Sequence, residues 1–469
     1  MSIHLKLAFK SLKGFTPICG TECKMKKWGV VLIIAFFLRF IPAYSRQHDD
    51  SSFSGLIESA KTFVHILKEG RYTDATSGFD ATMTKVMPES ILKSTWEGLL
   101  KRAGALVSQT GTRTENVGNY DAVYVLCQFE KEKIDIKIVF DKEEKIAGLF
   151  FLPSQEYKIP AYSNPNLYQE KEVMVGKGEW ELPGTLALPK AEGPIPGLVL
   201  VHGSGPNDRN ESIGPNKPFQ DIAWGLASQG IAVLRYDKRT KVYQQKMAAM
   251  KTNLTVKDET IEDALAALEL LRDTQGIDKK RIFVLGHSLG GMLMPRLGLK
   301  DSGIAGFIVM AGPTRPLEDL VLEQMKFAYW LDGSLTDEEK SNLGKIEEAV
   351  ITIKKLDASQ AELTGDRILG ARPGYWLDLK GYNPAEVAKE ISRPFFILQG
   401  GRDYQVKKTD FDGWKKHLAS RSDVEFKFYP LANHLFIMGR GISTPAEYLT
   451  AGNVADEVIQ DIADWIERH

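Results

Sequence analysis

The stretch that decides the fold is RIFVLGHSLGG, residues 281–291. Its first five residues form the apolar run of a short strand, and the next five fit the pattern G-x-S-x-G. A serine lifted off a strand by a sharp turn brings Gly286 and Gly290 close to other backbone, where a Cβ does not fit. Such a turn exposes the hydroxyl of Ser288 and points the first amides of the next helix at its target. A plain glycine-rich turn of an α/β protein is the alternative.

Length, composition and charge limit the kinds of protein that this chain can be. The chain has 469 residues, of which 43% are hydrophobic and 26% charged, with a formal net charge of −1. Its length exceeds what one core usually fills, so we expect two domains and a targeting segment. The balanced charge, without a basic stripe or repeat, argues against nucleic acid as a partner. Cys19, Cys23 and Cys127 match neither a disulfide framework nor a zinc motif, and we expect no metal or cofactor.

Residues 1–45 are predicted to be an N-terminal extension and a signal peptide. Lysines follow Met25, and WGVVLIIAFFL comes next, as in the charged and apolar regions of a secretory signal. Small residues near Ser45 fit a cleavage site, and Met25 is a better start than Met1. An uncleaved anchor is the alternative, because the apolar run continues past Arg39 through Phe40 and Ile41. The run is shorter than the ~20 residues of a membrane-spanning helix, which favours the cleaved form. We expect a secreted or envelope-associated protein, attached to membrane or cell wall, if at all, through its N-terminus.

Residues 53–153 are predicted to form a small α+β domain. Apolar residues recur at helical spacing in residues 56–70 and 88–104, and residues 119–153 alternate apolar with polar positions, as in an antiparallel meander. The region has no nucleophile or metal cluster, and its one histidine, His65, is expected to be structural or solvated.

Residues 157–469 are predicted to form a second, larger domain. A strand pair at residues 171–189 opens it, and continuous apolar strands then alternate with amphipathic helices. The predicted strands are residues 197–202, 231–237, 281–286, 306–312, 394–400 and 424–430. Continuous apolar strands are buried on both faces, which indicates a mostly parallel sheet sandwiched by helices. Ligands of such sheets bind beyond the carboxyl ends of the strands, so the site is expected there.

Three candidates lie at these strand ends. The glycine-rich loop after residues 197–202 contains Ser204, whose amide, or that of Gly203, is predicted to form an oxyanion hole with the amide of Leu289. Asp403 follows the strand at residues 394–400 and can orient a histidine. The alternatives are a plain tight turn at the first place and an aspartate that only caps a turn at the second.

The third candidate, His434, is chosen by elimination. The other histidines lie in terminal sequence, in the first domain, on an exposed helix, or in the loop and elbow already described. His434 follows the strand at residues 424–430, and histidine, whose reference pKa is near neutral, suits a general base. Ser288, Asp403 and His434 stand in the chain order of a Ser-Asp-His triad.

Residues 172–469 resemble the α/β-hydrolase superfamily, in the branch of serine aminopeptidases and bacterial carboxylesterases of the EstD type. The motifs that carry this resemblance are HGSGPNDRNE, FQDIAWGLASQGIAVLRYDKRT, GHSLGGML, GGRDYQV and NHLF. The resemblance implies that Ser288 is the nucleophile, Asp403 the orienting acid and His434 the base. Residues 53–153 resemble the cone-like α+β domains of unknown function that precede such hydrolases in some secreted bacterial proteins.

An insertion at about residues 313–393 is predicted to form a helical cap over the catalytic face. Tyr329, Trp330, Tyr375 and Trp376 could line an acyl or aromatic pocket, or they could only pack the cap onto the sheet. The turn at residues 237–239 is expected to be a structural, salt-bridged turn.

The sequence therefore predicts a secreted serine hydrolase that cleaves small carboxylic esters through an acyl-enzyme. No acidic cluster stands ready for a substrate α-amino group, which favours an ester over a short peptide. Two alternatives stay open. One is a serine aminopeptidase or acyl-peptide hydrolase, and the other is a non-catalytic binding protein on the hydrolase fold. The oligomeric state, the acyl chain and the leaving group are not predicted.

Overall fold

The computed structural model describes residues 51–117, 120–154, 157–250, 254–357, 359 and 367–469. Contacts divide the described chain into two compact units, residues 51–154 and residues 157–469 with their gaps. The predicted signal peptide, with its start at Met25 and its cleavage near Ser45, lies outside the described residues. In the part of the chain that is described, no helix is both long and apolar enough to cross a membrane.

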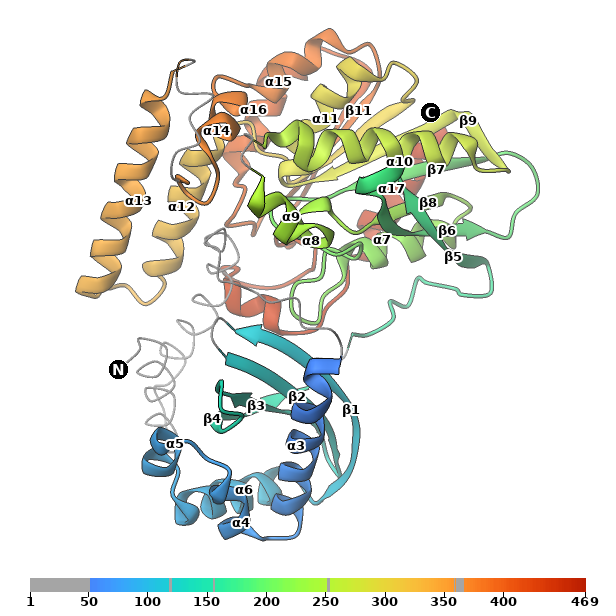
Figure 1. Ribbon diagram of the computed structural model, residues 1–469. Coiled ribbons are helices and arrows are strands. Elements are labelled where there is room, and N and C mark those ends of the chain that lie inside the picture. Colours follow the sequence, from blue (N-terminus) through green and yellow to red (C-terminus); the bar gives the residue numbers. More distant parts are fainter. Residues whose placement is uncertain (1–50, 118–119, 155–156, 251–253, 358, 360–366) are drawn as a thin grey trace. The chain divides into compact units, whose positions relative to one another are not determined.

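The first unit is an α+β domain in which helices pack on a four-stranded antiparallel sheet (Figure 1). The sheet order follows the chain, β1-β2-β3-β4. The helices are α3 (Ser51–Lys68), α4 (Tyr72–Ser77), α5 (Ala81–Val86) and α6 (Glu89–Ala103), and the strands are β1 (Leu106–Val117), β2 (Tyr120–Phe129), β3 (Lys133–Phe140) and β4 (Ile146–Pro153).

The core of this unit accounts for the helical spacing of apolar residues in α3 and α6, because those residues are buried in it. Trp96 of α6 is 1% exposed and contacts the rings of Phe129 and Phe151 on the sheet. Cys127 is buried in β2, and burial, followed by the charge of Asp135, raises the pKa of its thiol to about 12. His65 is largely exposed and pairs with Glu69. The thiol and this histidine are therefore structural or solvated groups.

Strand β1 extends the predicted meander by one strand. Its sequence, LVSQTGTRTENV, shows little apolar alternation because it is an edge strand whose residues from Val107 to Thr114 are mostly exposed. Backbone pairing with β2 places it in the sheet, in a register that shifts near Leu106 and Gln109. Side-chain periodicity carries little information about such a strand.

The second unit is an eight-stranded sheet in the order β12-β11-β10-β9-β7-β8-β6-β5. Strands β5 and β6 form an antiparallel pair, β6 joins β8 antiparallel, and all other neighbours are parallel. The strands are β5 (Tyr168–Val175), β6 (Leu182–Pro189), β7 (Ile195–Val201), β8 (Ala232–Tyr236), β9 (Ile277–His287), β10 (Gly306–Met310), β11 (Phe395–Gly400) and β12 (Val424–Tyr429).

Helices cover both faces of this sheet, so its central strands are apolar on both sides (Figure 1). Every residue of β7, β10 and β11 is buried. One face packs against α10 (Glu262–Asp273), α11 (Leu289–Lys300) and α16 (Lys408–Leu418), and the other against α7 (Pro218–Ala227) and α17 (Asp456–Arg468). This is the mostly parallel sheet sandwiched by helices that the continuous apolar strands predict, and it agrees with the α/β-hydrolase fold that the resemblance implies.

The short elements between β8 and α10 are α8 (Arg239–Val242), α9 (Gln244–Ala249) and a π-helix, η2 (Lys257–Ile261). The insertion between β10 and β11 is helical, as predicted. It contains α12 (Leu317–Tyr329), α13 (Asp337–Lys355), α14 (Pro373–Leu379) and α15 (Pro384–Val387). Helices α12 and α13 lie side by side (Figure 1) and share a small core around Met325, Leu343 and Ile346. A capping box at Thr336 and Glu339 starts α13.

Candidate active site

Ser288 sits on a strained turn between β9 and α11. Its φ is +53° and its ψ is −119°, a backbone conformation that costs free energy in a residue with a side chain. A Cβ at Gly290 would lie 2.3 Å from the carbonyl oxygen of Val201, and one at Gly286 would lie 2.4 Å from the backbone of Gly290. The two glycines of the motif are therefore required because backbone packs directly on backbone, as the spacing predicts.

The loop after β7 passes close to the elbow. A Cβ at Gly203 would lie 3.1 Å from the Cβ of Ser288. The amide of Gly203 donates to Oε1 of Glu211 at 2.7 Å, so this amide is occupied. Within the described residues, the amides of Ser204 and Leu289 have no recorded acceptor, so both are available to a ligand. Of the two loop amides considered for the oxyanion hole, only that of Ser204 is available.

Asp403 and His434 come from neighbouring strand ends and meet. Nδ1 of His434 donates to Oδ2 of Asp403 at 2.7 Å, and both residues are buried. The other oxygen, Oδ1, accepts from the amides of Gln405 and Val406 at 2.8 and 3.0 Å. These two amides fix the carboxylate, and the carboxylate in turn fixes the histidine so that Nε2 presents its lone pair.

His287, the residue before Ser288, links the elbow to His434. Nε2 of His287 donates to the carbonyl oxygen of His434 at 3.0 Å, and the two imidazole rings lie 4.6 Å apart. In the described part of the chain, neither the hydroxyl of Ser288 nor Nε2 of His434 has a recorded hydrogen bond. The structure therefore joins Asp403 to His434 but shows no hydrogen bond between His434 and Ser288 among the described residues.

A second buried pair, Glu211 and His287, was not predicted. Oε2 of Glu211 lies 2.8 Å from Nδ1 of His287. Burial opposes charge on both groups, but the charge and hydrogen bond of each partner outweigh it: the pKa of His287 is raised and the pKa of Glu211 is lowered. The pair is thus an ion pair that joins the elbow to the loop at Gly203. Glu211 ends the motif HGSGPNDRNE, which was the available signal.

The turn after β8 is salt-bridged, as predicted. Asp237 pairs with Arg209, Lys238 with Glu259, and Arg239 with Asp263. Beside it, His202 packs between the rings of Phe219 and Tyr236. Burial, the largest influence, lowers the pKa of His202 to about 4, and its Nε2 contacts the carbonyl oxygen of Asp208 at 3.1 Å. His202 therefore supports the loop as a neutral group.

Comparison with known proteins decides the family. The family described as serine aminopeptidase, S33, matches residues 198–440, which is more than half of the chain. Esterase EstD of Thermotoga maritima is 37% identical over 417 residues, covering 88% of this chain and 96% of that protein. The chain belongs to the S33 hydrolase family. It is therefore a hydrolase, and Ser288 stands in the nucleophile-elbow motif of its α/β-hydrolase fold.

The other comparisons concern the fold and the first domain. Residues 60–149 match a family described as a protein of unknown function, DUF3887. Among solved structures, an esterase of Pyrococcus furiosus is 18% identical with a TM-score of 0.41, covering 67% of this hydrolase and 96% of that chain. The acylaminoacyl peptidase of Pyrococcus horikoshii is 13% identical with a TM-score of 0.44, covering 77% of this chain and 56% of that one.

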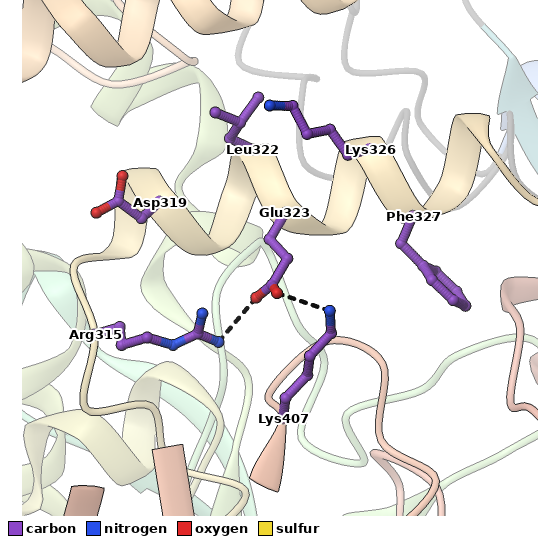
Figure 2. Close-up of a pocket in the computed structure, with 7 residues that line it drawn as sticks. All are labelled: Arg315, Asp319, Leu322, Glu323, Lys326, Phe327 and Lys407. Atoms are coloured by element: carbon purple, nitrogen blue, oxygen red, sulfur yellow. Dashed lines mark hydrogen bonds and ion pairs between the residues drawn. The ribbon is translucent and has the colours of Figure 1, made fainter. Parts of the chain in front are cut away.

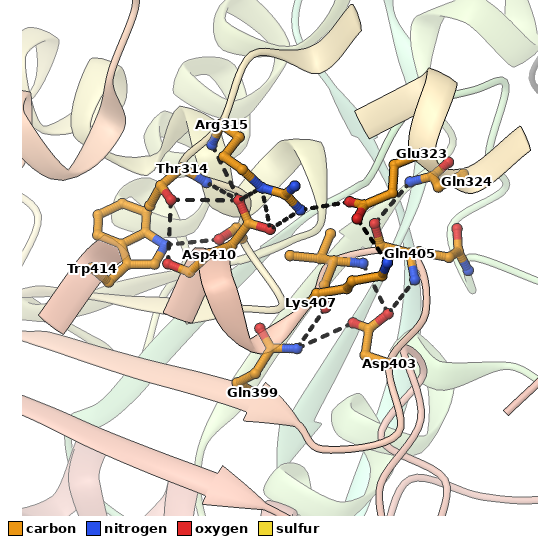
Figure 3. Close-up of polar contacts among 12 residues, drawn as sticks. Thr314, Arg315, Glu323, Gln324, Gln399, Asp403, Gln405, Lys407, Asp410 and Trp414 are labelled. Carbon is orange, nitrogen blue, oxygen red and sulfur yellow. Dashed lines mark hydrogen bonds and ion pairs between the residues drawn. The ribbon is translucent and has the colours of Figure 1, made fainter. Parts of the chain in front are cut away.

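Cap helix α12 is joined to the loop that carries Asp403, as Figure 3 shows. Nε2 of Gln324 donates to the carbonyl oxygen of Gln405 at 3.1 Å, and Lys407 pairs with Glu323 at 2.7 Å. The rings of Phe327 and Tyr404 stack 4.8 Å apart. The loop that carries Asp403 is thus held from α12 as well as from the sheet.

An open cavity of about 400 Å³ lies along α12 (Figure 2). Its lining residues are Arg315, Asp319, Leu322, Glu323, Lys326, Phe327 and Lys407. Figure 2 shows Glu323 between Arg315 and Lys407, and ion pairs join it to both. The charges that face this cavity therefore largely neutralise one another.

The four aromatic residues proposed for a pocket lie elsewhere, and none is among the residues that line this cavity. Trp376 is 3% exposed, packs among cap residues, and donates from Nε1 to the carbonyl oxygen of Ile368. Tyr329 joins the core shared by α12 and α13, and Trp330 is 57% exposed. Tyr375 donates its hydroxyl to Oε2 of Glu259 at 2.9 Å. In these positions Tyr329, Tyr375 and Trp376 pack or form hydrogen bonds, and Trp330 is exposed. No cluster of three or more metal-ligating side chains occurs among the described residues.

Proposed function

We propose that this protein is a serine esterase that hydrolyses small carboxylic esters through an acyl-enzyme. The observation that carries the proposal is the buried pair of Asp403 and His434, 2.7 Å apart, beside the strained elbow of Ser288. The relative named an esterase, identical at 37% of aligned positions, supports an ester as the substrate. Ser288 is the nucleophile, His434 the general base and Asp403 the orienting acid.

The reaction has two halves. Oγ of Ser288 attacks the ester carbonyl carbon while Nε2 of His434 takes its proton, and the carbonyl oxygen becomes an oxyanion that the amides of Ser204 and Leu289 bind. The C–O bond to the alcohol then breaks, and the alcohol leaves with the proton from His434. Water repeats the sequence on the acyl-enzyme, with His434 as base and then acid, which releases the carboxylic acid and restores Ser288.

The decisive experiment measures turnover of short-chain p-nitrophenyl esters. The Ser288→Ala variant is expected to lose at least about 10⁴-fold in kcat, because the nucleophile is removed. Ser341→Ala, at an exposed position on α13, is the matched control and should keep wild-type activity. Wild-type turnover that persists in Ser288→Ala refutes the proposal.

Two further assays separate the alternatives. Aminoacyl anilides assayed beside the esters test the aminopeptidase or acyl-peptide hydrolase, which the family description favours. A kcat/KM for anilides that exceeds the value for esters would replace the esterase by a peptidase. Labelling of Ser288 by a fluorophosphonate excludes a non-catalytic binding protein, since an inactive pocket stays unmodified.

We also propose export through the signal at Met25, with cleavage near Ser45, on the sequence pattern alone. Secretion and N-terminal sequencing of the protein test this. A mature N-terminus close to Ser45 supports a cleaved signal, retention of the apolar run in the membrane supports the anchored form, and a full-length soluble product overturns both.

A further inference from the structure

Lys238 is the most deeply buried lysine among those the structure describes, at 1% exposure. It follows β8, and its Nζ makes two contacts. Nζ donates to the carbonyl oxygen of Gly203 at 2.8 Å and to Oε1 of Glu259 at 2.6 Å. Burying a lysine is costly unless it is paired, and Glu259 supplies that partner. The ion pair accounts for the charge but leaves the contact with Gly203 to be explained.

The carbonyl of Gly203 and the amide of Ser204 belong to one peptide group. No cis peptide bond occurs in the described chain, so in this planar unit the N–H of Ser204 points opposite to the carbonyl of Gly203. Nδ2 of Asn207 also donates to the carbonyl of Gly203, at 3.2 Å. Two donors on the oxygen side therefore set the direction of the N–H on the other side.

The remaining contacts of this loop agree with an N–H of Ser204 that is free to bind a ligand. The amide of Gly203 is held by Glu211, and the Cα of Gly203 lies beside Ser288. The amide of Ser204 is left without a recorded acceptor in the described residues, so its hydrogen is unused. A cation on the carbonyl oxygen also polarises the peptide, which strengthens its N–H as a donor.

We propose that Lys238, assisted by Asn207, is a positioning residue that orients and polarises the Gly203–Ser204 peptide, so that the amide of Ser204 is a stronger donor to the oxyanion. This inference rests on the proposed function. The same lysine joins the donor to the cap, because Oε2 of Glu259 accepts the hydroxyl of Tyr375 on α14 at 2.9 Å. The chain of contacts runs from the cap through Glu259 and Lys238 to the oxyanion hole.

The test is the double variant Lys238→Met with Glu259→Gln, which removes both charges and leaves no unpaired ion in the core. The expected result is a kcat for p-nitrophenyl butyrate reduced by about 10- to 100-fold, with KM changed by less than about threefold, because a donor is weakened and not removed. Affinity for a trifluoromethyl ketone, which forms a tetrahedral anion on Ser288, should fall by a similar factor.

The matched control is Arg239→Met with Asp263→Asn, the neighbouring buried ion pair, which has no contact with the carbonyl of Gly203. It reports the effect of deleting a buried pair from the same turn and should keep kcat and ketone affinity close to wild type. A charge-deleted Lys238 variant that folds and keeps both values within about twofold of this control overturns the inference.

A second variant tests the inference if the double variant does not fold. Asn207→Ala removes the neutral donor to the same oxygen without leaving a charge, and it should lower kcat and ketone affinity together by a few-fold. No change in either value in Asn207→Ala counts against the inference. If wild type turns over no ester, or Ser288→Ala keeps its activity, the proposed function fails first. Wild-type turnover that depends on Ser288 but not on Lys238 or Asn207 overturns this inference and leaves the proposed function standing.

Discussion

Two histidine–carboxylate pairs lie next to each other in this hydrolase, and they differ in what the second ring nitrogen does. His434 pairs with Asp403 at 2.7 Å and His287 pairs with Glu211 at 2.8 Å, with the two rings 4.6 Å apart. Nε2 of His434 has no recorded partner in the described chain, whereas Nε2 of His287 donates to the carbonyl oxygen of His434.

This difference decides which pair can transfer a proton. A carbonyl oxygen only accepts, so Nε2 of His287 carries a hydrogen that is already used, and His287 cannot serve as a base. The first pair therefore has the geometry of a catalytic dyad, and the second holds the backbone of the elbow, the loop and His434 in place. Burial and a close carboxylate do not by themselves mark a catalytic histidine.

The largest effect is expected at the first pair. Asp403→Asn should lower kcat by about 10⁴-fold, because an amide no longer holds His434 in the tautomer with a free Nε2 or stabilises its charge. Asp412→Asn, an exposed carboxylate paired with Lys408, is the control. Ester turnover by purified protein measures both. Equal losses in the two variants would contradict the assignment of the acid.

The second pair is expected to matter less. Glu211→Gln keeps an acceptor for the amide of Gly203 but removes the charge that faces His287. The loop should shift and not collapse, so we expect kcat to fall by about 10- to 100-fold, below the loss from Asp403→Asn. A loss as large as that of Asp403→Asn would erase the distinction between the pairs.

The second pair also predicts a pH dependence of stability. The pKa of His287 is raised, so its contribution is present below the ordinary value of 6.5 and is lost as the pH rises through its folded pKa. The pKa of Glu211 is lowered, so its contribution is present above 4.5 and is lost as the pH falls. His202 and Asp403 also face this pair, and Lys238 faces His202, so only the difference between wild type and Glu211→Gln isolates it.

That difference in Tm should be greatest, about 3 °C or more, near pH 5.5–6.5 and should shrink at higher pH, once His287 is neutral. Thermal unfolding followed by circular dichroism at several pH values measures it. A difference that grows steadily with pH contradicts an ion pair at this place.

The smallest effect is expected at Glu323, whose ion pairs join α12 to the loop that carries Asp403. Glu323→Gln breaks ion pairs with Lys407 and Arg315 whose side chains are 40% and 30% exposed. Such pairs contribute roughly 0.2–1 kcal/mol, so kcat should change by less than about threefold and Tm by about 1–3 °C. The change should fade at about 0.5 M salt, because salt screens exposed charges. A loss of activity comparable to that of Glu211→Gln would give the cap a larger part in holding Asp403.

Local patterns predicted most of the fold, because its strands are continuous and apolar and its elbow is a five-residue motif. Strands β7 to β12 each coincide with one of the six predicted runs, and β5 and β6 with the predicted strand pair. Asp403 and His434 were placed by the rule that parallel strands end at one edge of the sheet. The structure brings these two residues together, although they are 31 residues apart.

The contacts that the sequence did not predict join residues that lie far apart along the chain. Glu211 reaches His287 across 76 residues and Lys238 reaches Gly203 across 35, and neither spacing has a local signature. Strand β1 was not predicted, because it lies at the edge of the sheet and its polar side chains show little apolar alternation. The cap aromatics were identified by type, but only the fold tells that Trp376 faces its own cap and Trp330 faces solvent.

The missing Cβ atoms of Gly286 and Gly290 have a practical consequence for engineering. Because α11 rests on the end of β7 with no side chain between them, this rim leaves no room in which to enlarge or reshape a substrate chamber. The helices inserted between β10 and β11 have side chains of their own to exchange. Libraries that aim to change substrate preference should therefore diversify the inserted helices and leave the rim intact.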